Sequence, residues 1–388
     1  MSSGSFYKNL TEESLICGRC GNCRSDCPVY QEIGWESAAP RGKISLAREL
    51  FARNAGKLSP EYAKRVTQCT LCGACTKACA ARIDLQALWQ DLRAQVVAAG
   101  QAPAAYTAMV ANLKDKKNIS SFANITRLDW AEELEEIPDA LDQEPGAEIA
   151  YFVGCVSSFF PRAAQVPVAM VQLLQKAEAS FTTLGPEEWC CGFPLLAAGQ
   201  PEAIGEFARH NVAQVRELGA KTLVTGCASC YHVFSHVYPE LVGEPLGFRL
   251  VHATELLAEL LTEGRLVPRE VDVTVTYHDP CDLGRNSGVV SAPRAVINSI
   301  PGVRLVEMAT AGEDSTCCGG GGNLQGADPG LADAIARKRI QEAAATGASI
   351  VVSACQQCEQ MLEKAARAEK LPLTVMDVAE LLLMALAK

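Results

Sequence analysis

The chain has 388 residues, of which 48% are hydrophobic and 21% are charged, and its net charge is −10. This size and composition predict a globular protein of two or three domains with buried cores. The negative charge gives no electrostatic support for a nucleic-acid-binding function. Residues 1–100 carry 13 Lys and Arg against 9 Asp and Glu. We interpret this basic excess as a mixed solvated surface, with a docking face for a redox partner as the alternative.

The segment MSSGSFYKNLTEES has no basic region followed by an apolar core, so no signal peptide is expected. No apolar run approaches the roughly 18–20 residues that span a bilayer. We therefore expect a cytoplasmic protein that is membrane-associated only through partners. Disulfides are rare in reducing compartments, so the 18 cysteines favour metal ligation over a disulfide scaffold.

Two short-spaced cysteine runs mark residues 15–85. A helix-like stretch at 44–53 lies between them, after a turn signal in APRG at 39–42. The alanine-rich residues 86–113 predict helices broken at Gly100 and Pro103. The charged segment 114–147 contains turn signals at Pro138 and at the pair Pro145 and Gly146, and it predicts a linker.

Beyond the linker, short apolar runs alternate with helical patterns in two successive sets. The first set predicts strands at 148–153, 180–184, 221–225 and 248–251, and helices near 162–178, 200–218 and 253–262. The second set predicts strands near 272–277, 303–307, 349–352 and 373–376, and helices near 292–299, 330–346, 356–369 and 377–387. Such alternation favours parallel sheets with crossover helices.

The cysteines of this part form two copies of one pattern. The first copy is Cys155, Cys190, Cys191, Cys227 and Cys230, and the second is Cys281, Cys317, Cys318, Cys355 and Cys358. Corresponding cysteines are 126, 127 and 128 residues apart. This register predicts two α/β units of about 125 residues related by a pseudo-twofold axis. Each cysteine group follows a predicted strand, at the edge where open α/β sheets bind ligands.

The N-terminal runs have the spacing of bacterial ferredoxins. The first is Cys17, Cys20, Cys23 and Cys27 followed by Pro28, and the second is Cys69, Cys72, Cys75 and Cys79 followed by Ala80. In such runs three cysteines hold one 4Fe–4S cluster and the fourth reaches the other cluster. This rule groups Cys17, Cys20 and Cys23 with Cys79, and Cys69, Cys72 and Cys75 with Cys27. Structural zinc sites use cysteine pairs with a longer gap, so a zinc-stabilised structural protein is the weaker alternative.

The five-cysteine copies resemble a known family. The segments GC at 154–155, WCCGFP at 189–194 and GCASCY at 226–231 are followed by HDPCDLGR at 278–285, CCGGGGN at 317–323 and ACQQCEQML at 354–362. They resemble two CCG domains. With the ferredoxin-like front, the arrangement resembles a heterodisulfide reductase catalytic subunit in which both parts are fused. Iron–sulfur subunits of glycolate, lactate and anaerobic glycerol-3-phosphate dehydrogenases are similar in layout.

The resemblance implies cofactors and candidate site residues. Each complete CCG copy is expected to bind a noncubane 4Fe–4S cluster through its five cysteines, in addition to the two ferredoxin-type clusters. Cys191, Cys318 and His278 are the catalytic candidates. Asp282 departs from the family, where an aromatic residue or histidine often follows the cysteine, so substrate contacts near Cys281 are not carried over. Gly319–Gly322 lacks the strand and helix of a phosphate loop, and we expect it to let backbone approach a cluster closely.

The expected fold is an α-helical ferredoxin-like N-terminal domain followed by two pseudo-twofold-related α/β CCG domains with parallel sheets. The expected ranges are 1–100 for the ferredoxin-like domain, 101–147 for a helical segment and linker, 148–265 for the first CCG domain and 266–388 for the second.

We therefore predict an oxidoreductase, namely an iron–sulfur electron-transfer subunit of an anaerobic multi-subunit complex that is similar to heterodisulfide reductase. Two ferredoxin-type clusters would feed two facing noncubane clusters, which would reduce a disulfide with one electron each. The alternative is a pure electron relay of a flavin-dependent hydroxyacid dehydrogenase, a bifurcating complex or a benzoyl-CoA reductase. No flavin or NAD fingerprint is visible, so we expect a flavoprotein or another redox subunit as partner. We expect no nucleic-acid partner and no direct membrane span.

Overall fold

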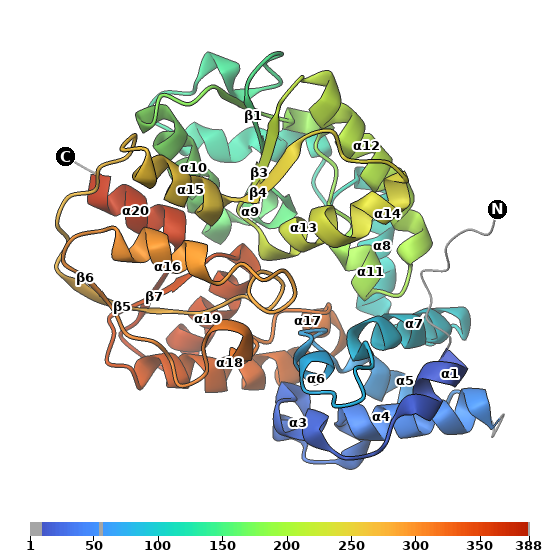
Figure 1. Cartoon of the computed structure of the whole chain (residues 1–388). Helices are drawn as coiled ribbons and strands as arrows, with labels where there is room; N and C mark the ends of the chain where they lie inside the picture. The colour runs from blue at the N-terminus through green and yellow to red at the C-terminus, as the bar shows by residue number, and fades with distance from the viewer. Residues whose placement is uncertain (1–9, 54–56, 387–388) are drawn as a thin grey trace. The chain divides into compact units, whose positions relative to one another are not determined.

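The computed structural model describes residues 10–53 and 57–386, which form two compact units (Figure 1). The first unit holds the described residues up to Ala111, together with Pro194–Ala203 and Thr316–Arg339. The second unit holds Asn112–Phe193, Ile204–Ser315 and the described residues from Ile340 onward. Neither unit is therefore one continuous stretch of chain.

The first unit is built from short helices, and its described residues include no strand. Its N-terminal helices are α1 (Leu10–Ile16), α2 (Asn22–Ser25), α3 (Pro28–Ile33), α4 (Pro40–Ala47), α5 (Pro60–Thr67), α6 (Ala74–Lys77), α7 (Leu85–Ala98) and the start of α8 (Ala104–Lys116). Later residues add most of α11 (Phe193–Ala197), α17 (Leu324–Ala327) and the start of α18 (Pro329–Ala344). A proline begins α3, α4 and α5, where its missing N–H costs no helical hydrogen bond. The break predicted between 86 and 113 is confirmed, since α7 ends before Gly100 and α8 begins after Pro103.

Helix α7 forms the core of the first unit. Its side chains Leu85, Leu88, Trp89, Leu92 and Val96 are buried, at the spacing that places them on one face of a helix. This face packs against α5 and α6. The helix therefore lies directly beneath the second short-spaced cysteine run, which surrounds α6.

The second unit contains two four-stranded sheets in which every pairing is parallel. The first sheet has the order β2-β1-β3-β4 and the second has the order β6-β5-β7-β8. The strands are β1 (Ile149–Phe152), β2 (Phe181–Thr183), β3 (Thr222–Thr225), β4 (Arg249–His252), β5 (Val273–Tyr277), β6 (Val303–Leu305), β7 (Ile350–Ser353) and β8 (Thr374–Asp377). All eight predicted strands are confirmed, with ends that differ by no more than a few residues.

The two sheets share one topology, and this topology fixes where ligands gather. The chain leaves the inner pair β1 and β3 in opposite directions, and it does the same at β5 and β7. Ligand sites of open α/β sheets lie at the carboxyl ends of strands at such a reversal. Strand β1 is buried along its whole length, as expected for the interior of a parallel sheet.

Helices connect and follow the strands of both sheets. They are α9 (Cys155–Phe159), α10 (Gln165–Lys176), α12 (Ile204–Glu217), α13 (Ala228–His232), α14 (Tyr238–Val242) and α15 (Ala253–Thr262) in the first half, and α16 (Ser291–Asn298), the end of α18, α19 (Gln356–Ala368) and α20 (Val378–Leu386) in the second. Helix α10 packs against α20 and α15 packs against α16, so helices of both halves share one layer (Figure 1).

The segment predicted as a linker is irregular but not solvent-exposed throughout. A run of 3-10 turns covers Asn124–Glu133 and buries Arg127, Trp130 and Ala131. It packs against α9 and α10 beside the first sheet. This stretch therefore contributes side chains to the interior of the second unit.

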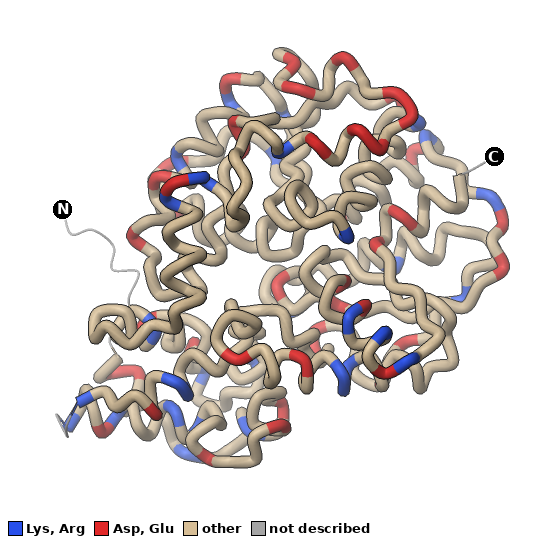
Figure 2. The backbone as a smooth tube through the Cα atoms, turned by 180° about the vertical axis from the view of Figure 1, so that it is seen from behind, with Lys and Arg blue, Asp and Glu red and all other residues tan. Residues whose placement is uncertain are grey.

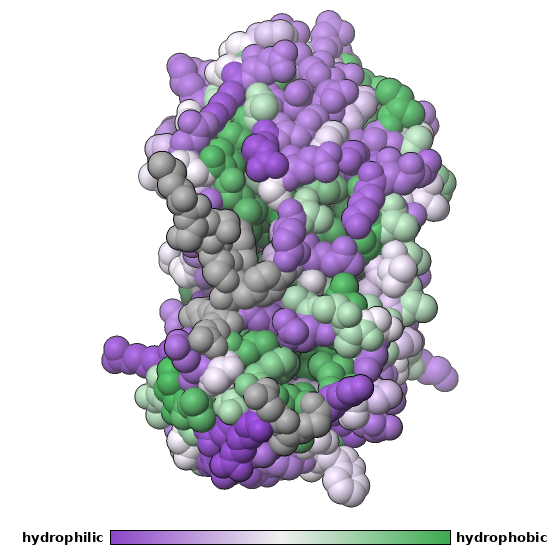
Figure 3. Space-filling view, turned by 90° about the vertical axis from the view of Figure 1, so that its right-hand side faces the viewer, coloured by the Kyte–Doolittle hydropathy of each residue, from purple (hydrophilic) through white to green (hydrophobic). Residues whose placement is uncertain are grey.

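The surface carries both signs of charge. Lys and Arg are interspersed with Asp and Glu along the backbone of each unit (Figure 2). On the face drawn in Figure 3, hydrophilic side chains cover most of the surface and apolar ones form smaller patches. Within residues 10–53 and 57–386, no helix has both the length and the apolar character needed to cross a bilayer.

Candidate metal centres

Four cysteines of the N-terminal runs surround one hollow of about 380 Å³. Cys17, Cys20 and Cys23 line it from the loop between α1 and α2 and from α2 itself, and Cys79 lines it from the end of the second run. Cys20 is exposed, whereas the other three are half-buried. The structure thus brings together the four cysteines that the ferredoxin spacing assigns to one cluster.

The other four cysteines of these runs surround a second hollow of about 370 Å³, lined by Cys27, Cys69, Cys72 and Cys75. Lys43 is buried in its wall and donates from Nζ to the carbonyl oxygen of Gln68 at 2.9 Å. Burial raises the pKa of Cys27 to about 12, and the positive charge of Lys43 opposes this shift. A thiolate here consequently needs a positive partner.

The two runs share a loop shape as well as a spacing. Arg19 and Leu71, each two residues after the first cysteine of its run, have φ angles of 59° and 52°. Positive φ is uncommon for residues other than glycine, so its occurrence at equivalent positions shows that one loop conformation is repeated. Four sulfur atoms around a hollow with mostly apolar walls are donors that suit an iron–sulfur cluster.

The five cysteines of the first copy converge at the carboxyl ends of β1, β2 and β3. Cys155 begins α9, Cys190 and Cys191 follow β2, and Cys227 and Cys230 lie at the start of α13. All five are buried. Thiol–thiol hydrogen bonds join Cys155 to Cys190 and Cys191 to Cys230. The parallel sheet thus gathers residues that are up to 75 positions apart in the sequence.

This packing gives the five thiols different pKa values. Hydrogen bonds from Cys190 and Cys230 lower the pKa of Cys191 to about 6. The same contact to Cys191 raises the pKa of Cys230 well above its usual range. A metal centre that holds all five as thiolates removes this competition, because its positive charge stabilises each sulfur. The donor set therefore fits an iron–sulfur group.

A glycine follows each adjacent cysteine pair, and neither position tolerates a side chain. Gly192 and Gly319 have φ angles of 89° and 86°. A Cβ atom at Gly192 would lie 2.8 Å from Cγ2 of Ile204, and one at Gly319 would lie 2.4 Å from the carbonyl oxygen of Ala332. The amide of each glycine donates to the sulfur two residues earlier, at 3.5 and 3.4 Å. The third letter of the CCG motif therefore has a steric cause.

Two polar side chains hold the backbone of the first cysteine pair. Asn211 accepts from the amide of Trp189 at 3.0 Å and donates to the carbonyl of Cys190 at 3.3 Å. The Tyr238 hydroxyl donates to the carbonyl of Cys191 at 3.0 Å and accepts from Asn211. These contacts hold the backbone of Cys190 and Cys191 in place and leave both sulfur atoms available for a metal centre.

A buried ion pair supports the loop that follows β1. The Glu188 carboxylate accepts from the amides of Val153 and Gly154 at 2.7 and 2.8 Å. Arg127 donates from Nη1 to Glu188 Oε1 at 2.6 Å and from Nη2 to Cys155 Sγ at 3.6 Å. Burial raises the pKa of Glu188, although Arg127 opposes the shift. The pair thus links the backbone of this loop to one of its sulfur atoms.

The second copy is divided between the two units. Cys281 lies in the turn after β5, and Cys355 and Cys358 lie at the start of α19 after β7, all in the second unit. Cys317 and Cys318 belong to the first unit. The structure brings Cys355 and Cys358 together through a thiol–thiol hydrogen bond. The assembly of all five into one ligand set stays a prediction.

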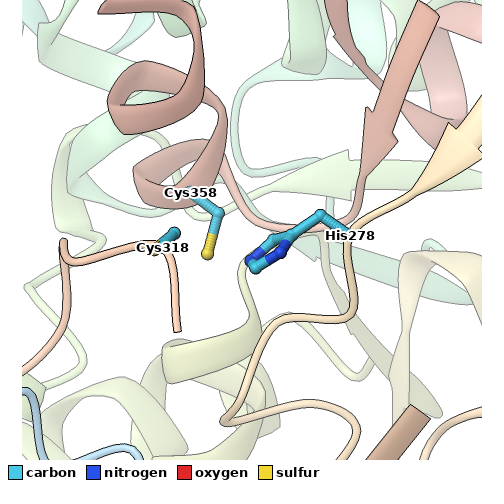
Figure 4. Close-up of side chains that lie close together, drawn as sticks. All are labelled: His278, Cys318 and Cys358. Atoms are coloured by element: carbon cyan, nitrogen blue, oxygen red, sulfur yellow. The ribbon is translucent and has the colours of Figure 1, made fainter. Parts of the chain in front are cut away.

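The candidate His278 lies at the end of β5. It is buried, and its ring nitrogen lies within 4.8 Å of Cys358 Sγ. Figure 4 shows the imidazole directed toward this sulfur. The neighbouring Asp279 is engaged elsewhere, because it accepts two hydrogen bonds from Arg294 at 2.7 and 2.8 Å. Of these two side chains, His278 is therefore the one positioned near a thiol.

The two copies meet within the second unit. The thiols of Cys227 and Cys355, one from each copy, hydrogen-bond to each other. Ser229 donates to Asp282 Oδ2 at 2.7 Å, and Asn286 donates to Asp282 Oδ1 at 2.9 Å. Asp282, the residue that departs from the family pattern, therefore ties the first copy to the second.

In the first unit, Arg93 joins loops from distant parts of the sequence. Its guanidinium is buried and donates to four backbone carbonyls. These belong to Thr67 at 3.2 Å, Cys69 at 2.6 Å, Ala197 at 2.5 Å and Gly322 at 2.7 Å. One cation thus connects a ferredoxin-type cysteine loop with the loop that follows Cys317 and Cys318.

The glycines after Cys318 permit this approach. A Cβ atom at Gly321 would lie 2.6 Å from the carbonyl oxygen of Thr70, and one at Gly322 would lie 2.5 Å from that of Cys69. These two glycines thus allow a close approach to the backbone of the other cysteine motif, while the expected approach of this segment to a cluster stays a prediction.

Comparison with known proteins gives matches along most of the chain. A model of the 4Fe-4S dicluster domain matches residues 13–83, and a model of the cysteine-rich domain CCG matches residues 149–235 and 275–363. One subunit of the dihydromethanophenazine:CoB–CoM heterodisulfide reductase of Methanosarcina mazei is 35% identical over 98% of this chain and 96% of its own length. The chain belongs to the family of this heterodisulfide reductase subunit.

Membership in the heterodisulfide reductase family makes the chain an iron–sulfur electron-transfer subunit of an oxidoreductase, as predicted. One subunit of the fumarate reductase (CoM/CoB) of Methanothermobacter marburgensis is 29% identical over 97% of this chain and 73% of its own length. A crystal structure of a hypothetical protein from Helicobacter pylori covers 98% of this chain and 71% of its own, with a TM-score of 0.60 and 9% identity. That likeness concerns the fold alone.

The burial of two arginines of this chain was not predicted from its sequence. Arg127 lies in the predicted linker, where nothing local indicates burial. Arg93 follows Leu92 in the apolar face of α7, and a charged residue inside such a face is the signal that could have found it.

Proposed function

We propose that this chain holds four iron–sulfur clusters and carries electrons from two ferredoxin-type clusters to two noncubane clusters that reduce a disulfide. The ferredoxin-type ligands are Cys17, Cys20, Cys23 and Cys79 for one cluster and Cys69, Cys72, Cys75 and Cys27 for the other. The noncubane ligands are Cys155, Cys190, Cys191, Cys227 and Cys230 for the first and Cys281, Cys317, Cys318, Cys355 and Cys358 for the second.

The contact made by Arg93 is the observation that supports an electron path between the two kinds of site. It connects the carbonyl of Cys69 with that of Gly322, four residues after Cys318, through hydrogen bonds of 2.6 and 2.7 Å. Gly322 brings these two loops to backbone contact, because no side chain separates them. Electrons that reach the Cys69 site therefore have a short covalent and hydrogen-bonded path toward the second five-cysteine copy.

Disulfide reduction fits a pair of facing sites. Breaking one disulfide takes two electrons and two protons and gives two thiols, and an iron–sulfur cluster supplies one electron at a time. The hydrogen bond between Cys227 and Cys355 supports the facing arrangement of the two copies. We propose that His278, buried within 4.8 Å of Cys358 Sγ, holds one of the two protons. Cys191 and Cys318 are the proposed ligands nearest to the chemistry.

The proposed setting is a larger complex. The relatives are named as subunits of a heterodisulfide reductase and of a fumarate reductase, and we propose that a flavoprotein or another redox subunit supplies the electrons to this chain. A cytoplasmic location, with membrane association through partners only, is part of the same proposal.

A pure electron relay is the second candidate. All five cysteines of the first copy are buried, and a disulfide substrate would have to reach this site. A relay needs no such access. It would serve a flavin-dependent hydroxyacid dehydrogenase, a bifurcating complex or a benzoyl-CoA reductase.

The test is electron paramagnetic resonance of protein purified without oxygen. The CoM–CoB heterodisulfide is added to the reduced protein, and thiol release is measured with a reduced viologen as donor. A disulfide reductase gives a paramagnetic signal that depends on the disulfide, together with two thiols per disulfide consumed. Clusters that are reduced and reoxidised with neither result would overturn the disulfide reaction in favour of the relay.

A further inference from the structure

We propose that Arg127 is a positioning residue that raises the reduction potential of the first five-cysteine site. The inference rests on the proposed function, because it requires a cluster bound to Cys155. It concerns a residue outside every cysteine motif. Arg127 lies 28 positions before Cys155, in the 3-10 turns between α8 and the first sheet.

The guanidinium of Arg127 is held in one place from several sides. It is 1% exposed, and Nη1 donates to Glu188 at 2.6 Å and to Ser158 Oγ at 3.3 Å. Nε donates to Asn124 at 3.3 Å, and the group stacks over the ring of Phe159 at 5.0 Å. These contacts leave Nη2 directed at the sulfur of Cys155, 3.6 Å away.

The ion pair is oriented, and its positive end faces the sulfur. The Glu188 oxygens are already engaged by the amides of Val153 and Gly154 on the other side of the pair. A reduced cluster carries one more negative charge than an oxidised one, so a nearby cation stabilises the reduced state. Charge and hydrogen bonds at ligand sulfurs are among the factors that set iron–sulfur potentials. Burial strengthens the effect, because the local dielectric is low.

Arg294 of the second half is held differently from Arg127. Arg294, on α16 beside the second copy, donates to both oxygens of Asp279 and both oxygens of Glu307. Two carboxylates therefore neutralise this guanidinium, whereas one carboxylate neutralises Arg127. The guanidinium of Arg127 therefore keeps one amino group for a cysteine sulfur, whereas that of Arg294 is held by carboxylates.

The experiment is a reductive titration of the anaerobically purified full chain, followed by electron paramagnetic resonance. Arg127→Gln combined with Glu188→Gln removes the pair without leaving a lone buried charge. We expect this double variant to lower the midpoint potential of one CCG-type signal by at least about 59 mV. This shift corresponds to a tenfold change in the one-electron equilibrium constant. Glu188→Gln alone leaves the cation uncompensated and is expected to raise the same potential. Arg127→Lys keeps the charge and is expected to shift it less than the double variant.

Arg265→Gln is the matched control, because Arg265 lies in the same unit and donates to the carbonyl of Ala177, not to a sulfur. It is expected to leave all potentials unchanged. Iron content distinguishes a failure of the proposed function from a failure of the inference about Arg127. If wild-type protein lacks the iron of the five-cysteine sites, the proposed function fails and this inference fails with it. If the iron is present and neither the double variant nor Glu188→Gln moves any CCG-type potential, the inference about Arg127 alone is overturned.

Discussion

The two halves of the second unit have the same sheet and different electrostatics. Both have four parallel strands in equivalent order, and both place cysteines after the first and third strands. The first half directs a guanidinium, that of Arg127, at a sulfur, and the second half commits that of Arg294 to carboxylates. The backbone repeat thus determines where the sulfur atoms lie, while side chains that are not repeated determine the charge around each site.

The last strand of each sheet shows the same divergence. β4 ends at His252 and β8 ends at Asp377, and each of these residues caps the helix that follows. Burial lowers the pKa of His252 to about 4 and raises the pKa of Asp377 to about 7. One backbone position therefore carries a base in the first half and an acid in the second, and both are neutral over part of the acidic range.

Removing one thiol from each copy should give the largest effect. Cys191→Ser and Cys318→Ser each delete one of five proposed ligands, so we expect each variant to lose about four irons per chain and the disulfide reductase activity. Iron analysis and thiol release check this expectation. Ser158→Ala keeps all five thiols of the first copy and should retain the iron. Loss of activity with Cys191→Ser but not with Cys318→Ser would contradict a joint requirement for both sites.

Replacing Arg93 tests the link between the motifs. Arg93→Met leaves four buried carbonyls without their donor, at a cost of roughly 1–3 kcal/mol for each group that stays unsatisfied. We expect a loss of about 3–5 kcal/mol in the free energy of unfolding and slower electron transfer to the second copy. Anaerobic urea unfolding and rapid-freeze spectroscopy measure these effects. Arg93→Lys retains the charge and should lose less. Wild-type stability in Arg93→Met would show that the four hydrogen bonds of Arg93 do not stabilise the fold.

Weakening the ion pair of the second half should affect stability. Asp279→Asn breaks the bidentate contact with Arg294, in which Asp279 is buried and Arg294 is 19% exposed. We expect a loss of about 2 kcal/mol, less than for a fully buried pair because Arg294 is partly solvated. Glu307→Gln removes the more exposed carboxylate and should cost less than about 1 kcal/mol. Thermal unfolding without oxygen distinguishes the two, and equal losses would contradict this ranking.

The two strand-end residues should give small pH effects of opposite sign. The folded-state pKa of His252 lies below its unfolded value, so its contribution to stability falls as pH decreases from 7 toward 4. The folded-state pKa of Asp377 lies above its unfolded value, so its contribution falls as pH increases from 4 toward 7. Between pH 5.5 and 7, each should change the free energy of unfolding by about 1–2 kcal/mol. His252→Gln and Asp377→Asn should each remove its own slope, and unchanged slopes would show that these residues do not titrate on unfolding.

Local patterns were enough to predict the strands and the longer helices between them, but not short helices such as α5 and α13. The apolar runs of β1 and β5 are short and bounded by turn residues, so the sequence defines where each strand begins and ends. Three ligands of each ferredoxin-type site are close in sequence, and the spacing rule for ferredoxins supplies the fourth from the other run. Apart from that fourth ligand, these features depend on neighbours within about ten positions.

The buried arginines could not be predicted in the same way. Arg127 meets Glu188 across 61 residues, and Arg93 meets Gly322 across 229. Nothing in the charge pattern of either segment shows which carboxylate or carbonyl it will reach, because that pairing is made only when distant loops pack. The apparent linker at 114–147 hid Arg127 for the same reason.

The count of iron per chain distinguishes a protein with four clusters from one with two. Protein purified without oxygen is assayed for iron and acid-labile sulfide against its measured concentration. Four clusters, two ferredoxin-type and two noncubane, predict about sixteen irons per chain. A value of about eight, with the five-cysteine copies intact, would contradict the account, because the ferredoxin-type sites alone would hold that iron.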